Sequence, residues 1–194
     1  MTTQRTRPET MGENDVIDLL LAQHAMIRNL FDEVEQAAPD RRGEAFTRLV
    51  RLLAVHETAE EEIVHPYARL KIEGGDAVVD DRLAEENHAK ELLQQMDQAG
   101  PEAPDFAEKL AVLRAAVEAH ARSEERYEFP QLRGHTSEAE RRSMALGVKA
   151  AEAMAPTHPH PGTESATKNV LMGTPIAMMD RVRDVIRQAM GKRG

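Results

Sequence analysis

The feature that most constrains this chain is a pattern of histidine and glutamate residues that repeats after 64 residues. Three pairs of identical residues stand 64 positions apart: His24 and His88, His56 and His120, and Glu60 and Glu124. The surrounding residues match as well, because residues 56–66 (HETAEEEIVHP) align with residues 120–130 (HARSEERYEFP). The chain therefore contains an internal duplication of a two-helix unit. Two related hairpins are expected to arrange the repeated side chains about a pseudo-twofold axis.

Apolar residues in four successive segments recur at steps of three and four, which is the period of one face of an α-helix. The segments cover about residues 14–37, 41–73, 76–99 and 105–130, and proline or glycine residues separate them. One of the four repeated histidines falls on the predicted inner face of each segment. No segment alternates apolar and polar residues as a strand would. The sequence therefore predicts an all-α protein, an up-down-up-down four-helix bundle with additional C-terminal helices.

The same pattern divides the chain into three regions. Residues 1–13 are expected to form a flexible N-terminal arm, and residues 14–132 the bundle that carries the repeated histidines and glutamates. Residues 133–194 form a C-terminal extension, with a helix, a proline-rich linker at 156–162 and a terminal helix. We expect the terminal helix to dock on the bundle or on another subunit.

Composition excludes several classes of protein. The chain has 194 residues, no cysteine and a formal net charge of −9. Without cysteine there is no disulfide, thiolate nucleophile or iron–sulfur cluster, so any metal must be held by histidine, carboxylate or tyrosine. The negative charge opposes binding to a nucleic-acid backbone. The sequence has no run of about 18 apolar residues and no signal peptide. We expect no nucleic-acid partner, no membrane association and a cytoplasmic location, whereas protein partners stay open.

The spacing of the repeated residues predicts a metal centre. In each repeat a histidine precedes a glutamate by four residues, so both side chains lie on the same face of one helix. With a histidine from each of the other two helices, four imidazoles and two carboxylates would meet inside the bundle. Burying them unpaired would cost several kcal/mol each, and two bound dications bridged by the glutamates would remove that cost. This donor set suits non-haem iron, with manganese or zinc as alternatives. The other interpretation is a duplicated core whose histidines are structural.

The pattern H…HxxxE…H…HxxxE resembles the hemerythrin-like, HHE cation-binding family over residues 14–132, and the extension after Gly134 resembles those of actinobacterial members. The resemblance implies a left-handed four-helix bundle that holds two iron ions joined by an oxo or hydroxo bridge. It also implies the metal ligands: His24 and His56 on one iron, His88 and His120 on the other, and Glu60 and Glu124 as bridges.

The chain departs from oxygen-carrying hemerythrin, which has a fifth histidine one turn from the histidine of the third helix. Here the residues four positions before and after His88 are Ala84 and Leu92, and neither can bind a metal. Each iron could then have one open position. Open coordination favours small-molecule chemistry at the metals over simple reversible storage of O₂.

The resemblance and this departure imply a protein that binds or processes O₂, H₂O₂ or NO, with catalase-like or NO-linked peroxide activity as one form. The ligand pocket is expected to have apolar walls: Leu20, Ile27, Phe31, Leu53, Leu92 and Val117. The alternatives are an iron- or oxygen-sensing interaction module and, less favoured, iron storage. The sequence leaves open whether the protein is an enzyme.

Three further residues are candidate ligands of the metals. Glu57 is next to His56, and it could bind one iron or simply face solvent. On an ideal helix, Tyr67 and Tyr127 each lie about 20° from the metal-binding histidine of their own helix, so both could approach the metals. The same geometry turns His65 about 180° away from His56, which predicts that His65 faces outward.

Overall fold

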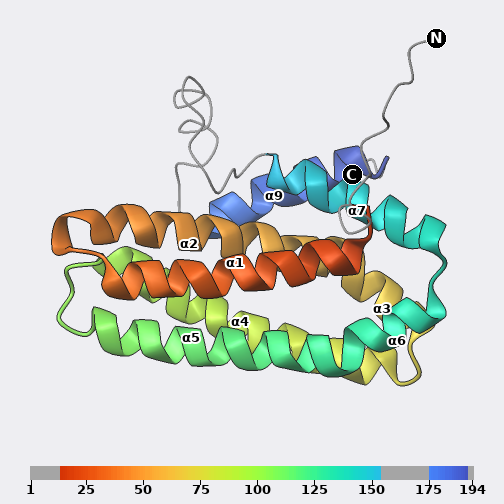
Figure 1. Ribbon diagram of the computed structural model, residues 1–194, viewed down its shortest axis with the longest axis horizontal. Coiled ribbons are helices and arrows are strands. Elements are labelled where there is room, and N and C mark those ends of the chain that lie inside the picture. The colour runs from red at the N-terminus through yellow and green to blue at the C-terminus, as the bar shows by residue number, and fades with distance from the viewer. Residues whose placement is uncertain (1–13, 154–174, 192–194) are drawn as a thin grey trace, which may run out of the picture.

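The computed structural model describes residues 14–153 and 175–191, and these residues are almost entirely helical, with no strand among them (Figure 1). The predicted arm at residues 1–13 and the proline-rich linker at residues 156–162 lie outside the described residues. Within the described ranges, no helix combines the length and the apolar character that a membrane crossing requires.

The first hairpin pairs α1 (Val16–Gln36) with α2 (Pro39–Ala59). The side chain of Asp15 accepts a hydrogen bond of 3.0 Å from the backbone N–H of Ile17 and so caps the start of α1. Pro39 is the first residue of α2. A backbone N–H at this position makes no hydrogen bond within the helix, so the N–H that proline lacks is not needed there. Two residues join the helices, and this short connection forces them to run antiparallel.

Each of the two repeats contains a π-helical turn, and the two turns are again 64 residues apart. In the first repeat α2 continues through the turn η1 (Glu60–Val64) into α3 (His65–Lys71). In the second repeat α5 (Phe106–Ser123) continues through η2 (Glu124–Glu128) into α6 (Phe129–His135). The long helix α4 (Gly75–Ala99) precedes α5. The duplication seen in the sequence is therefore also a duplication of backbone conformation.

The π-helical turns explain how these helices accept an internal proline. Pro66 and Pro130 each stand two residues after a turn. Proline lacks an N–H and its ring clashes with the carbonyl of residue i−4 in a regular helix. A π-helical turn bonds each N–H to residue i−5 and locally widens the helix. We attribute the two π-helical turns to the prolines, because the wider turn avoids the clash and allows the helix to continue as α3 or α6.

The four long helices form a bundle in which α1 lies beside α2 and α4 beside α5 (Figure 1). The predicted up-down-up-down four-helix bundle is confirmed. Two more helices, α7 (Glu138–Glu152) and α9 (Pro175–Ala189), pack on the outer side of α1 and α2 and against each other. Their buried apolar residues join the core of the bundle: Met144, Val148, Met179, Val182 and Ile186. These two helices of the extension are thus part of the same hydrophobic core.

Ion pairs hold α9 beside the first π-helical turn. Arg183 contacts Glu61 at 3.2 Å and Glu62 at 2.9 Å, and Arg187 donates two hydrogen bonds of 2.9 Å to Glu62. Lys90 of α4 pairs with Glu61 as well. The basic face of the terminal helix is therefore a docking face on the bundle, as one of the two sequence-based expectations stated.

Candidate metal centre

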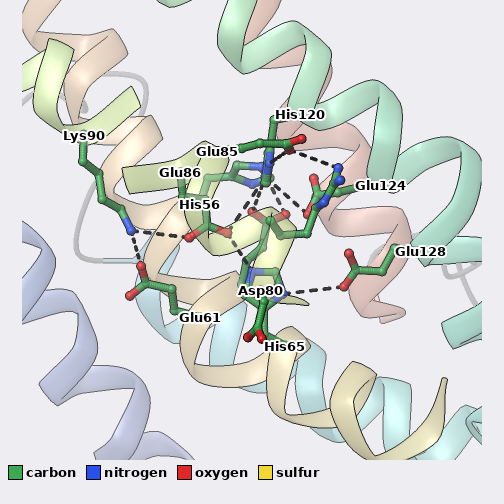
Figure 2. A network of polar contacts seen from close by, with 12 residues as sticks. His56, Glu61, His65, Asp80, Glu85, Glu86, Lys90, His120, Glu124 and Glu128 are labelled. Carbon is green, nitrogen blue, oxygen red and sulfur yellow. Dashed lines mark hydrogen bonds and ion pairs between the residues drawn. The ribbon is translucent and has the colours of Figure 1, made fainter. Parts of the chain in front are cut away.

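Three imidazoles and three carboxylates gather in the interior of the bundle, and they come from α1, α4 and the two helices that continue into π-helical turns. Figure 2 labels four of them: His56, Glu86, His120 and Glu124. All six side chains are buried: His24, His56, Glu60, Glu86, His120 and Glu124. Their nitrogen and oxygen atoms form two groups that share Glu60, and within each group the atoms lie within 4.8 Å of one another. Six polar groups in an apolar interior, brought together from separate helices, form a candidate binding site for cations.

The first group consists of His24, His56, Glu60 and Glu124. The two imidazole Nε2 atoms are 3.0 Å apart. The Nε2 atom of His24 lies 3.3 Å from Oε2 of Glu124, and Nε2 of His56 lies 3.3 Å from Oε1 of Glu60. Two nitrogens and two oxygens therefore face one point, which is the arrangement of a first-row metal site with imidazole and carboxylate ligands.

The second group is built around His120, with Glu60 and Glu86. The Nε2 atom of His120 lies 3.7 Å from Oε2 of Glu60, 4.0 Å from Oε1 of Glu86 and 3.5 Å from Oε1 of Glu124. Glu60 and Glu124 therefore turn one oxygen toward each group. Two carboxylates in this position can each bridge a pair of metal ions.

The outer nitrogen of each imidazole is held by a further side chain. His24 donates from Nδ1 to Glu125 at 2.8 Å, and His120 donates from Nδ1 to Glu85 at 3.0 Å. His56 donates from Nδ1 to Oε1 of Gln23 at 2.8 Å. Such bonds fix the tautomer and the ring orientation of metal-binding histidines and leave Nε2 to face the metal.

The contact of His56 extends beyond the bundle itself. Gln23 donates from Nε2 to Oε1 of Glu152, the last residue of α7, at 2.8 Å. A chain of two hydrogen bonds therefore connects the C-terminal extension to an imidazole of the candidate centre. Because Gln23 must keep its oxygen toward His56, Glu152 fixes which way the Gln23 amide points.

Burial and mutual repulsion perturb the charges of the cluster. Burial, followed by repulsion from Glu124, raises the pKa of Glu60 well above its usual value. Burial would also raise the pKa of Glu124, but His120 and His24 lower it to about 2. Burial lowers the pKa of His56, and the neighbouring His24 adds to this effect. Burial alone would lower the pKa of His120, but the Glu124 carboxylate and contacts with Glu60 and Glu85 raise it. The charge of each of these four side chains therefore depends on the charges of its neighbours in the cluster.

The residues present fit a pair of bound cations. Both oxygens of Glu60, both oxygens of Glu124 and Nε2 of His120 are buried and make no hydrogen bond with the described residues. An unpaired buried carboxylate is costly, and a coordinating cation is one of the few ways to compensate it. Nitrogen and oxygen donors without sulfur suit iron, manganese or zinc.

His88, predicted as the ligand from the third helix, is not part of this cluster. Its side chain is exposed, and the inward position on α4 belongs to Glu86, of which only 1% is exposed. The buried residues of α4 follow steps of three, four and seven: Val79, Glu86, Ala89, Leu93 and Met96. His88 is two residues, or about 200°, from Glu86, so the expectation that it faces inward is wrong.

His65, predicted to face outward, is buried with only 2% of its surface exposed. Its Nε2 atom lies 2.7 Å from Oε1 of Glu86, and its Nδ1 atom lies 3.6 Å from Glu128, as Figure 2 shows. Burial would lower the pKa of His65, but these two carboxylates raise it to about 10. The reason for the wrong expectation is η1, since its extra residue turns all later side chains by about 100°.

The two tyrosines differ in their placement. Tyr127 lies within η2 and is 61% exposed, so its predicted approach to the metals is wrong. Tyr67 is half-buried against the hydrophobic core, and its approach to the metals stays a prediction. Glu57, in contrast, is buried beside the cluster rather than facing solvent, and its Oε2 atom has no hydrogen-bond partner among the described residues. Burial and repulsion from Glu86 raise the pKa of Glu57 to about 8.

Comparison with known proteins agrees with this geometry. Residues 15–132 match the family model described as the hemerythrin HHE cation binding domain. An uncharacterized hemerythrin-like protein of Schizosaccharomyces pombe is 24% identical over 176 residues, which are 89% of this chain and 87% of the relative. A protein of Nostoc sp. named DNA nickase is 30% identical over 151 residues, which are 77% of this chain but only 42% of that relative. No solved structure matches the chain significantly.

Proposed function

The chain belongs to the hemerythrin HHE cation-binding family, and from this premise we propose that its bundle binds two iron ions that react with O₂, H₂O₂ or NO. The observation that carries the proposal is the orientation of two buried carboxylates. Glu60 turns one oxygen toward His56 and the other toward His120, and Glu124 faces His24 and His120 in the same way. Both carboxylates are therefore placed to join two ions, with an oxo or hydroxo bridge as the expected third link.

The first ion would be held by His24 and His56, and the second by His120 and Glu86, with Glu60 and Glu124 bridging. Two bound irons supply a position for a small oxidant and the electrons that reduce it. The chain's own residues keep the Nε2 atoms inward, because Glu125, Gln23 and Glu85 hold the opposite ring nitrogens. One site has two imidazoles and the other has one imidazole and an extra carboxylate, so we expect the two ions to bind with different affinities.

Glu57 is the remaining polar group at the proposed ligand position. It is buried beside the cluster, and one of its oxygens has no hydrogen-bond partner among the described residues. We expect Glu57 either to complete the coordination of one iron or to face the bound small molecule. The exposure of Tyr127 opposes such a role for that residue, whereas a role for Tyr67 stays a prediction.

The test is to load the purified protein with iron(II) without oxygen, and to add H₂O₂, NO or O₂ to separate samples. We expect two irons per chain, an oxo-bridge absorption after oxidation, and either oxygen release from H₂O₂ or consumption of NO. Glu60→Gln serves as the comparison, because it keeps the shape of the bridge and removes its charge. Iron-loaded protein that leaves all three small molecules unchanged would contradict the proposed chemistry, whereas protein without iron would contradict the metal centre itself.

Iron or oxygen sensing is a second candidate function, and the contacts of α9 favour it. Arg183 and Arg187 bind Glu61 and Glu62, which directly follow the proposed bridge Glu60 in the chain. A change at the centre could therefore alter the docking of α9. Limited proteolysis of metal-free and iron-loaded protein separates the two functions, since only a sensor needs a difference in cleavage at the start or end of α9.

The relative named DNA nickase raises a third activity, cleavage of DNA. The chain spans less than half of that relative, and its own net charge of −9 opposes binding to DNA. Absence of a nucleic-acid partner and a cytoplasmic location therefore stay predictions. Incubation of metal-loaded protein with supercoiled plasmid tests the first of these, and conversion of the plasmid to the relaxed form would overturn it.

A further inference from the structure

We infer that small uncharged molecules reach the candidate centre through a passage between α1, α2 and α5. This inference rests on the proposed function, because it names the route and the class of the ligand. Of the residues that line the passage, Ile27 and Val117 were expected from the sequence as apolar walls, whereas neither the sequence pattern nor the comparisons assign a role to Arg28, Glu118 or Ala121.

The passage is a narrow hollow that ends on the metal-binding imidazoles. Its lining includes three imidazoles and one carboxylate: His24, His56, His120 and Glu57. The three imidazoles are the same ones that turn their Nε2 atoms into the two metal-binding groups. The hollow therefore reaches the side chains that would hold the proposed ions.

Three aliphatic side chains also line the passage: Ile27, Val117 and Ala121. All three are buried, with exposed fractions of 2%, 6% and 5%. An apolar wall offers no compensation for a lost hydration shell, so ions pay a high cost to enter. O₂, NO and H₂O₂ carry no charge and avoid this cost, which makes uncharged diatomics and peroxide the favoured class.

The outer end is framed by two half-buried charged residues, Arg28 and Glu118. Arg28 donates a hydrogen bond of 2.7 Å to Oε1 of Glu125, and the same oxygen accepts from Nδ1 of His24. The arginine at the opening is thus tied to a proposed metal ligand through one carboxylate oxygen.

A second hollow lies on the other side of Glu57, among α2, α4 and α5. Leu53, Ala89, Leu93 and Leu113 line it, and Met179 of α9 forms part of its wall. Glu57 and Val117 border both hollows. Lys90 also lines this second hollow, but none of the three imidazoles does. We therefore assign entry to the first passage.

The test compares two substitutions of the same size, one in each hollow. Ala121→Leu narrows the first passage, and Ala89→Leu fills the second. The rates of NO binding to and release from the iron(II)-loaded protein are measured by stopped-flow absorption. We expect Ala121→Leu to slow both rates by about tenfold, as an added barrier of about 1.4 kcal/mol does. The dissociation constant for NO should stay unchanged, since a narrower passage slows binding and release by the same factor. Ala89→Leu should leave both rates at the wild-type value.

Equal rates in wild type and Ala121→Leu, or an equal slowing by Ala89→Leu, would overturn the assignment. If Ala121→Leu loses iron, Ala121→Val adds less bulk and is judged by the same criterion. A second measurement does not need the metal: crystals of the metal-free protein are pressurised with xenon, which binds apolar cavities. We expect a xenon atom beside Ala121 that disappears in Ala121→Leu, and its absence in wild type would count against the passage. Protein that binds xenon there but no iron would refute the proposed function and leave the hollow itself standing.

Discussion

The structure supports Glu86 as the metal ligand from α4, whereas the sequence pattern predicted His88. The substitution Glu86→Gln, with His88→Gln as the control, distinguishes these two assignments. Only 1% of Glu86 is exposed, and its Oε1 atom lies 2.7 Å from Nε2 of His65 and 4.0 Å from Nε2 of His120. Its other oxygen lies 3.4 Å from Nζ of Lys90. Glu86→Gln keeps the shape of the side chain and removes the charge that serves all three neighbours.

The size of the effect follows from these contacts. Removal of one partner from a buried ion pair costs about 3–5 kcal/mol. We expect about 3 kcal/mol for Glu86→Gln in the metal-free protein, because the amide oxygen still accepts one hydrogen bond. Loss of an anionic ligand should lower the affinity for the second iron by at least about 10–100-fold, which is the typical effect of losing a side chain that only orients a metal ligand. His88 is exposed, so His88→Gln should change stability by no more than about 0.5 kcal/mol.

The assay is an anaerobic titration of each metal-free variant with iron(II), together with urea unfolding of the metal-free forms. Wild type and His88→Gln are expected to bind two irons, and Glu86→Gln one tightly bound iron. The reverse result, in which His88→Gln loses an iron and Glu86→Gln keeps both, would refute the assignment of Glu86. It would also show that α4 presents a different face to the centre.

Three further predictions concern the ionisation of Glu57, the hydrogen bond from Gln23 to Glu152 and the packing around Gly147. Because burial raises the pKa of Glu57 to about 8, its ionisation destabilises the folded metal-free protein as pH rises from about 4.5 to about 8. Urea unfolding at pH 5 and pH 8 should show a loss of up to a few kcal/mol in wild type that is smaller in Glu57→Gln, and an equal loss in both would contradict the shift. Glu152→Ala frees the Gln23 amide that holds His56, so iron affinity should fall by up to about tenfold, and unchanged affinity would show that α7 gives no support. Gly147→Ala would place a Cβ 2.6 Å from an isoleucine methyl carbon and should cost about 1–3 kcal/mol in thermal unfolding. Gly134→Ala meets nothing within 4 Å and should not destabilise, so equal effects of the two would refute the packing.

Much of the fold was predictable because it follows from the spacing of the apolar residues and from the proline and glycine residues that separate the helices. Steps of three and four between apolar residues marked the long helices, and the residues around Pro39 and Gly100 marked two of the connections. The pairs His56–Glu60 and His120–Glu124 were predictable for the same reason. Each pair spans four residues of regular α-helix, where the angle between side chains is fixed.

The errors share two physical causes. The π-helical turns begin at Glu60 and Glu124, so every angle taken from an ideal helix across a turn is wrong by about 100°. That misplaced His65 and Tyr127. Proline two residues after each turn was the available signal, since a regular helix does not accept it.

The other cause was the inner face assigned to the third helix. His88 was placed inward because it was grouped with Leu83, Leu92 and Met96 as one helix face, and because it stands 64 residues after His24. The apolar steps of α4 instead fit Val79, Glu86 and Leu93, which are seven residues apart. A five-residue step between Leu83 and His88 already contradicted a common face, and the buried carboxylate could have been found from that spacing.

The measurement that tests the central claim most directly is anomalous diffraction at the iron edge from crystals of the iron-loaded protein. The account predicts two anomalous peaks inside the bundle, one between His24 and His56 and one beside His120 and Glu86, with Glu60 between them. A single peak, no peak in the bundle, or a peak at His88 would contradict it.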